Sequence, residues 1–330
     1  MAVKAYTTTI PEGLEKIVFA QIGLQAKSIE ESAEFAAKIT ESFTLPHAPI
    51  HVDQAQFTDI ADYENRLFMV YWRDVDEFEN WLLQADVQEW WNGKGLEGNI
   101  GLYHEVTKIP VTHFETIHSM QNNNSGVTHF LNLEGTKEHA YWGSMRKRIQ
   151  ASSMNRLDNS IEKIEHTKKE TLGKHLKVIP PNNICLIRTA QDWTRCNDEE
   201  KETYLSLVEP ALQKSYHYLN TNQEESGCIN PKFVQELDEN GNPVEKTCVV
   251  SFFLSLKHLE DWTHHHPTHI ALFGTFAEML RRHNLSVQLS LWHEVSVLQS
   301  DEVELEYINC HSDTGLLPYF KTKEMSYMYK

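Results

Sequence analysis

Two histidines in the second half of the sequence lie among apolar residues, where a side chain could bind a metal or transfer protons. His293 belongs to an alternating series whose other members are aliphatic: Leu285, Val287, Leu289, Leu291, Val295 and Val297. The residues between them are mostly polar. This period of two predicts a strand over 285–297 with an apolar face that includes His293 and a polar, solvated face.

His269 is the second candidate, and it belongs to a predicted helix over 259–282. Phe273, Phe276 and Leu280 follow it at spacings of four, three and four residues, so His269 heads an apolar stripe. A single histidine on an apolar face is usually a core residue. Two such histidines in neighbouring elements are candidate site residues that could hold a bound group between them.

The chemistry open to these histidines depends on how many ligands a bound metal needs. His266 and His269 share a helix face, but a catalytic zinc ion requires three protein ligands, and no convincing third is nearby. Glycine-rich nucleotide-binding loops and a Gly-x-Ser-x-Gly motif are absent from the sequence. Haem needs one protein ligand and an apolar slot, and a second histidine can then act as acid and base near neutral pH.

An internal repeat indicates the elements that position these residues. Three short motifs recur in order: Tyr71-Trp72 with Phe252-Phe253, Phe78–Trp81 with Leu259–Trp262, and Tyr103–Val106 with Trp292–Val295. Each copy predicts alternating strands and helices, so two α+β halves can combine their sheets in one pseudo-symmetric core. The strand histidine recurs as His104, which we interpret as structural, whereas Gln88 replaces His269 in the first copy.

The repeat also predicts the domain organisation. We expect a first half over 1–134, a mainly helical connection over the charged segment 135–178, a second half over 179–313, and a loosely packed C-terminal tail over 314–330. The second half contains both candidate histidines.

Composition limits the classes of partner and compartment. The chain has 47 acidic and 30 basic residues, a net charge of −17, which argues against binding to nucleic acid or to an anionic membrane surface. The five cysteines include no Cys-x-x-Cys pair, and no segment resembles a signal peptide or a membrane span. We therefore expect a cytoplasmic protein without a disulfide framework.

Several motifs together resemble those of the aldoxime dehydratases, especially the phenylacetaldoxime dehydratases of bacilli. They are Val18–Gly23, His113–Thr116, Tyr141–Arg148, Asp261–His264, His266–His269, Trp292–Val297, Tyr307–His311 and Thr314-Gly315. They extend over nearly the whole chain. The resemblance implies a dimeric α+β barrel fold built from two ferredoxin-like halves in one chain, with one bound haem b.

The resemblance also assigns roles to individual residues. It implies that His269 is the proximal iron ligand, His293 the distal catalytic histidine, Arg148 the pocket arginine and Glu115 the partner glutamate. The pocket serine of the family falls on Thr189. This is a departure from the family pattern, because threonine keeps the hydroxyl but adds a methyl group.

The implied reaction is the conversion of R-CH=N-OH to a nitrile and water, with the oxime nitrogen bound to ferrous haem. Protonated His293 would give its proton to the leaving hydroxyl, and neutral His293 would then take the carbon-bound proton. Glu115 and Arg148 would orient His293, and Thr189 would hold the hydroxyl. A reductant would keep the haem ferrous, and the protein would be a monomer or a homodimer.

Two other hypotheses remain open from the sequence. A non-catalytic haem carrier or sensor would keep His269 but would not need an acid–base group at position 293. A haem-free enzyme with a histidine-bound metal would show no Soret band. The preferred aldoxime is also left open, since aromatic and aliphatic pocket residues suit both arylalkyl and alkyl oximes.

Overall fold

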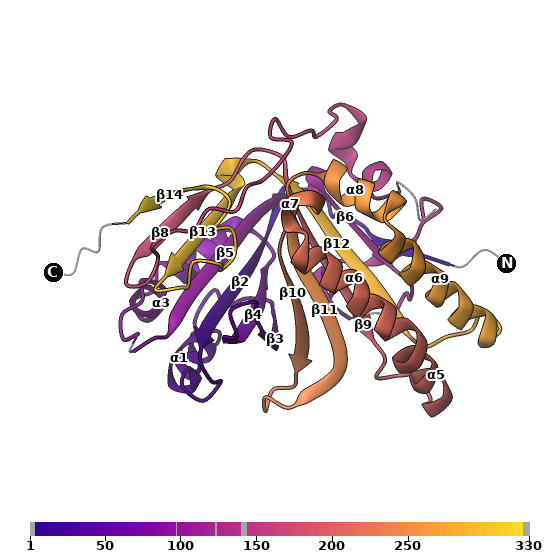
Figure 1. The fold of residues 1–330 in the computed structure, drawn as a ribbon, viewed down its shortest axis with the longest axis horizontal. Coiled ribbons are helices and arrows are strands. Elements are labelled where there is room, and N and C mark those ends of the chain that lie inside the picture. The colour runs from indigo at the N-terminus through magenta and orange to yellow at the C-terminus, as the bar shows by residue number, and fades with distance from the viewer. Residues whose placement is uncertain (1–3, 97, 123, 140–143, 326–330) are drawn as a thin grey trace.

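One large antiparallel sheet with helices on its outer faces makes up the protein, an α+β architecture (Figure 1). The computed structural model describes residues 4–96, 98–122, 124–139 and 144–325. Its strands are β1 (Tyr6–Thr8), β2 (Lys16–Ala26), β3 (His51–Thr58), β4 (Glu64–Trp72), β5 (Gly101–Pro110), β6 (Phe114–His118), β7 (Leu133–Gly135), β8 (His175–Ile179), β9 (Ile184–Asp192), β10 (Cys228–Leu237), β11 (Pro243–Phe253), β12 (Ser290–Leu298), β13 (Val303–Ile308) and β14 (Lys321–Glu324).

The helices lie mostly in the segments that connect these strands. They are α1 (Ala33–Ser42), α2 (Val75–Leu82), α3 (Ala85–Trp91), α4 (Ser144–Arg148), α5 (Asp198–Thr203), α6 (Glu209–Thr221), α7 (Gln223–Ser226), α8 (Leu256–His265) and α9 (Pro267–Arg282). Short 3₁₀ turns are η1 (Val111–His113), η2 (Gly126–His129), η3 (Gln150–Ser153) and η5 (Ser300–Glu302), and η4 (Tyr204–Val208) is a π-helix. None of the helices in the described ranges has the length and hydrophobicity that a bilayer crossing requires.

Two sets of four strands share one pattern within the sheet. The full order is β14-β8-β13-β5-β2-β4-β3-β10-β11-β9-β12-β6-β1-β7. When the strands of each set are numbered in chain order, β5-β2-β4-β3 reads fourth, first, third, second. The set β12-β9-β11-β10 reads the same way. The two sets meet where β3 pairs with β10, with Ala55 opposite Glu236.

The outer strands cross between the two sets. β6 follows the first set in sequence but pairs with β12, and β13 follows the second set but pairs with β5. Strands from residues 1–134 and 179–313 therefore pair with each other at the outer side of both sets. β6 thereby brings Glu115 next to the strand that carries His293.

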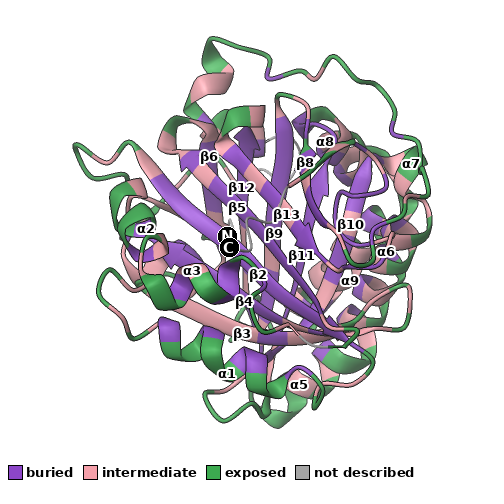
Figure 2. Cartoon of the chain, turned by 90° about the vertical axis from the view of Figure 1, so that its left-hand side faces the viewer, coloured by how far each residue is buried: buried purple, intermediate pink, exposed green. Residues whose placement is uncertain are grey.

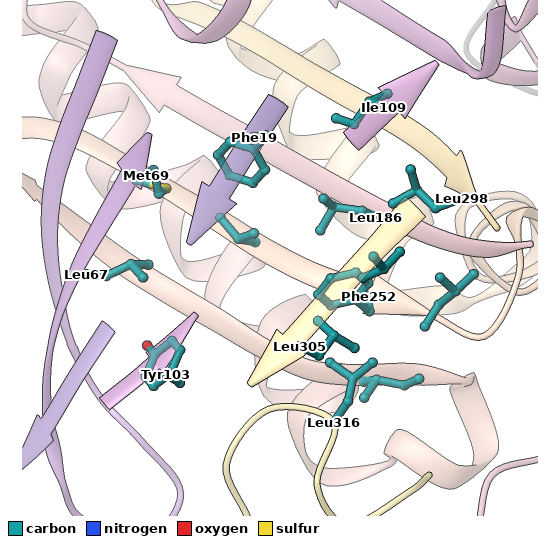
Figure 3. Packing of buried hydrophobic residues seen from close by; sticks show 14 of the residues in the cluster. Phe19, Leu67, Met69, Tyr103, Ile109, Leu186, Phe252, Leu298, Leu305 and Leu316 are labelled. Atoms are coloured by element: carbon teal, nitrogen blue, oxygen red, sulfur yellow. The ribbon is translucent and has the colours of Figure 1, made fainter. Parts of the chain in front are cut away.

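The inner faces of the two sets pack against each other and form a common core. Figure 3 shows Phe19 and Met69 from the first set and Leu186, Phe252 and Leu298 from the second within this cluster. All five are at most 3% exposed. Strands from both sets are buried in Figure 2, while the outward sides of the helices are exposed.

The outer face of the first set is filled by aromatic side chains from its own helices. Trp72, Trp81, Trp90 and Trp91 lie within one closed apolar cluster with residues of α1, α2 and α3. His104 belongs to this face. Its ring stacks on Trp91 with centroids 4.0 Å apart, and its Nε2–H donates to the Trp91 carbonyl at 2.9 Å. His104 therefore has the structural environment that the sequence predicts.

This environment predicts a pH dependence of stability. Burial lowers the pKa of His104 from 6.5 to about 4, so between these values the unfolded chain binds a proton that the folded chain does not. Stability should fall as pH falls through this window, by up to about 1.4 kcal/mol per pH unit for this one group. Urea unfolding of wild type and His104→Gln between pH 6.5 and 4.5 should give a smaller slope for the variant. Equal slopes would contradict the prediction.

Three expectations from the sequence need correction. The strand predicted over 285–297 begins at Ser290, because Asn284 and Leu285 adopt positive φ and turn the chain after α9. Its polar side is not solvated: Glu294 is 6% exposed and Ser296 is 2% exposed. The C-terminal tail does not pack loosely at its start, since Leu316 and Leu317 are fully buried; residues 326–330 lie outside the described range.

The connection over 135–178 is also less helical than expected. In its described part, α4 and η3 are the only helical segments, and residues 154–174 run without regular structure before β8. Its charged side chains bind neighbouring loops. Lys169 Nζ donates to the Leu317 carbonyl at 2.6 Å, and His166 pairs with Asp313 at 2.7 Å. These contacts with distant segments give the side chains of Lys169 and His166 polar partners although the connection is not helical here.

Candidate functional site

Three neighbouring strands bring predicted site residues together on the outer face of the second set. His293 on β12 lies directly opposite Thr189 on β9, so both side chains project from the same face. Glu115 on β6 lies opposite Val295, two residues after His293, and therefore projects from that face as well. In Figure 1, α6, α8 and α9 lie over this part of the sheet.

Glu115 joins His293 to Arg148. One carboxylate oxygen lies 2.8 Å from His293 Nε2, and the other accepts a bond of 2.6 Å from Arg148 Nε. The Glu115 side chain is fully buried and that of Arg148 is 5% exposed, whereas His293 remains 21% exposed. The histidine is thus the member of the cluster that a bound molecule can reach.

The charge state of Glu115 follows from these contacts. Burial by itself would raise the pKa of Glu115, but the charges and hydrogen bonds of His293 and Arg148 outweigh it and hold the pKa below its usual value. The carboxylate is therefore ionised at neutral pH. It can stabilise a protonated His293 and fix its ring through a charge-assisted hydrogen bond.

Arg148 reaches the cluster from α4. Its Nη1 also donates to the Glu138 carbonyl at 2.6 Å, which fixes the guanidinium from a second side. The basic run that includes Arg146 and Lys147 would, without the family resemblance, favour a solvated side chain. The buried pair with Glu115 shows otherwise. Tyr141, Trp142 and Gly143, which begin the matching motif, lie outside the described residues.

His269 lies in the first turn of α9, beside the end of α8. His266 caps the helix and Pro267 occupies its first position, where no hydrogen-bond donor is needed. His269 Nδ1–H donates to the Thr263 carbonyl at 2.8 Å, which leaves the lone pair on Nε2. Burial lowers the pKa of His269 to about 4, with a smaller contribution from His293.

These properties are those of a neutral imidazole ligand. A metal-bound histidine usually donates its second ring nitrogen to a carbonyl or carboxylate, which fixes the ring and its tautomer. The hydrogen bond from His269 Nδ1–H to the Thr263 carbonyl is of this kind.

The apolar surroundings of His269 also fit a flat hydrophobic group. Leu272 and Phe276 of α9, Val287 in the segment before β12 and Leu291 of β12 pack against one apolar cluster, and each is only partly buried. Burial of such aliphatic and aromatic side chains under an apolar ligand is favourable, because it removes apolar surface from water. A haem, which needs one axial ligand and an apolar slot, therefore suits the residues present.

Sequence reasoning missed two residues that position His269. Thr263 supplies the carbonyl acceptor, and the ring of Trp262 lies 4.4 Å from that of His269. Both belong to motifs already noted in the sequence, but their contacts with His269 depend on the break between α8 and α9, which periodicity does not predict. His311 is not part of the cluster, because its Nε2 pairs with Asp59 at 2.9 Å.

Comparison with known proteins places this geometry in a family. The family model described as haem-containing dehydratase matches residues 20–316. A phenylacetaldoxime dehydratase of Bacillus sp. (strain OxB-1) is 46% identical, covering 97% of this chain and 93% of its own length. An aliphatic aldoxime dehydratase of Pseudomonas chlororaphis is 32% identical, covering 93% and 88%. The crystal structure of an aldoxime dehydratase in complex with butyraldoxime superimposes with a TM-score of 0.89 at 30% identity, covering 97% and 90%.

Proposed function

This chain belongs to the haem-containing dehydratase family, and from that premise we propose that it converts aldoximes, R-CH=N-OH, to nitriles and water. The observation that carries the proposal is the His293–Glu115–Arg148 cluster on the sheet face that also carries Thr189. This is an acid–base group with its orienting partners, in a chain that also holds a buried histidine suited to bind iron. A haem carrier would not need such a cluster.

We propose that His269 would hold a haem b through Nε2, and that the partly buried side chains of α9, of β12 and of the segment between them would line its slot. When bound, ferrous haem would supply a metal centre that activates the N–O bond of the oxime. A reductant is then required to keep the iron ferrous.

His293 moves the protons in this proposal. Its Nε2–H donates to Glu115, so Nδ1 is the nitrogen that exchanges a proton with the substrate. Protonated His293 gives this proton to the leaving hydroxyl, which departs as water. Neutral His293 then takes the proton from the carbon as C≡N forms. The buried carboxylate of Glu115 balances the charge of the imidazolium in the first state.

Thr189 is proposed to hold the hydroxyl of the substrate. Thr189→Val keeps the shape and removes only the hydroxyl, so we expect kcat to fall about tenfold, the effect of losing one hydrogen bond of average strength. Thr189→Ser should stay within about twofold of wild type. Nitrile formation at saturating aldoxime, with haem content measured from the Soret band, checks both. A valine variant with wild-type kcat would remove Thr189 from the site.

We further propose that the two four-stranded sets are ferredoxin-like halves of a pseudo-symmetric barrel-like unit. Their common strand order supports this, with the boundaries near 134 and 179 modified by the exchange of β6 and β13. The protein would be a monomer or a homodimer. Five free, buried cysteines suit a reducing cytoplasm.

The experiment that tests the function is an absorption spectrum of the dithionite-reduced protein before and after phenylacetaldoxime is added, with nitrile assayed in the same sample. A substrate-dependent shift of the ferrous haem spectrum together with nitrile is expected. A haem spectrum without shift or nitrile would favour a carrier. A protein with no Soret band after reconstitution with haem would refute the proposal.

A further inference from the structure

A buried polar network lies behind the candidate site, on the inner face of the same two strands. Arg188 precedes Thr189 on β9, and Glu294 follows His293 on β12. Arg188 and Glu294 are opposite each other in the strand register, just as Thr189 and His293 are. The site pair and the network pair are therefore consecutive residues of the same strands.

Tyr71 of β4 connects the two network residues. Its hydroxyl donates to Glu294 Oε2 at 2.7 Å and accepts a bond of 2.9 Å from Arg188 Nη1. The other oxygen of Glu294 accepts a bond of 2.8 Å from the backbone N–H of Val127. Tyr71 is fully buried, so no solvent can replace its hydroxyl.

Further ion pairs fix Arg188 to both sets of strands. Arg188 Nη2 lies 2.7 Å from Asp53 on β3 and 3.0 Å from Glu236 on β10. Its guanidinium also lies over the ring of Trp292, 4.9 Å from the centroid. Asp53 and Tyr71 come from the first set of strands, and Arg188 and Glu294 come from the second. The first set therefore contributes bonds to the strands that carry the site.

The backbone near Glu294 shows how closely this network is packed. Gly126 has φ of +54°, and a Cβ atom at this position would lie 2.1 Å from Glu294 Oε1. A side chain there would displace the carboxylate that Val127 and Tyr71 hold. Glu294 therefore has very little room to move within the folded chain.

We propose that Tyr71 is a positioning residue of the candidate site: its bonds to Glu294 and Arg188 fix the pairing of β12 with β9 that sets His293 opposite Thr189. This inference rests on the proposed function. Strand side chains alternate between faces, so the positions of consecutive residues are linked through the backbone. If Glu294 loses its bond to Tyr71 and shifts, the backbone passes that shift on to His293. A misplacement of about 1 Å can greatly reduce the rate of a catalysed reaction.

The chain contains a matched control for this idea. Glu105 follows His104 on β5 as Glu294 follows His293 on β12. The hydroxyl of Tyr307 donates to Glu105 at 2.8 Å and accepts a bond of 3.0 Å from the Leu316 N–H. Tyr307 is 1% exposed. Tyr71 and Tyr307 thus both donate to a buried glutamate and are equally buried, although Tyr71 accepts from a guanidinium and Tyr307 from a backbone N–H; only Tyr71 lies behind the candidate site.

The test compares Tyr71→Phe with Tyr307→Phe in the haem-loaded protein. Three quantities are measured: kcat and KM for an aldoxime, the thermal midpoint, and the C–O stretching frequency of the ferrous CO complex, which reports hydrogen-bond donors near the iron. We expect similar losses of thermal stability in both variants. Only Tyr71→Phe should lower kcat about tenfold with KM within about twofold, and only it should shift or broaden the C–O band.

Parallel effects of the two variants on kcat and on the C–O band, or no effect of Tyr71→Phe on either, would overturn the proposal. If Tyr71→Phe does not fold, Glu294→Gln provides the same comparison against Glu105→Gln. The C–O band is measured without turnover. A wild-type protein that makes no nitrile therefore refutes the proposed function and leaves the test of Tyr71 intact.

Discussion

Replacement of His293 with alanine is expected to leave haem bound and to reduce kcat for nitrile formation by about 10²–10⁴-fold, the usual contribution of a positioned acid–base group. His293 is the exposed member of the cluster with Glu115 and Arg148, whose side chains are almost fully buried. Neither partner is positioned to replace it. Arginine stays protonated, and the carboxylate of Glu115 is fixed by two partners.

Initial rates at saturating aldoxime, normalised to haem content, measure this effect. His265→Ala is the control, since His265 is an exposed histidine of the neighbouring helix α8. It should behave as wild type. Undiminished turnover by His293→Ala would remove the acid–base assignment, and loss of haem in the same variant would show a structural role instead.

The second large effect is expected at His269. His269→Ala should purify with a haem content below about a tenth of wild type, because the one proposed protein bond to iron is lost while the apolar slot remains. His269 Nδ1–H donates to the Thr263 carbonyl, so Nε2 is the ring nitrogen proposed to bind iron. The ratio of Soret to protein absorbance measures the loss, and added imidazole should restore part of the Soret band.

His266→Ala distinguishes the ligand from its neighbour. The His266 side chain caps α9 and its ring stacks on Tyr218 with centroids 3.7 Å apart, so this variant should be less stable but keep its haem. Haem loss in His266→Ala together with full haem content in His269→Ala would show that His266, and not His269, is the ligand.

Much of this site follows from local sequence patterns, and the remainder depends on pairing between distant segments. Strict alternation places His293 with the aliphatic residues, and the spacing on α9 places His269 on an apolar stripe. Both patterns are properties of a single element. The repeat similarly predicts two α+β units; this stays a prediction, and the common strand order supports it.

The solvated face predicted for 285–297 is wrong for a reason that periodicity cannot detect. Polar residues on alternate positions usually face water, but Glu294 and Ser296 face the inner core. The groups that bind Glu294, Tyr71 and Val127, are more than 160 residues away in sequence. Sequence patterns show which residues share a face, whereas the partners that satisfy that face come from the assembled sheet.

The burial of Arg148 has a similar origin. Nothing in the run Arg146-Lys147-Arg148 separates a buried arginine from a solvated one, since all three carry the same charge. Its acceptor, Glu115, reaches it because β6 leaves the first set of strands and pairs with β12. Only the family resemblance identifies this arginine before the sheet is known.

The exchange of β6 and β13 also affects how this chain folds during its synthesis. β5 comprises residues 101–110, but its outer neighbour β13 comprises residues 303–308 and is made much later. β6 is likewise made long before its neighbour β12. The first half therefore exposes unpaired strand edges until these later strands have been made, which is a period of risk for aggregation. Pairing of the outer strands of the first half consequently depends on strands that come from the second half.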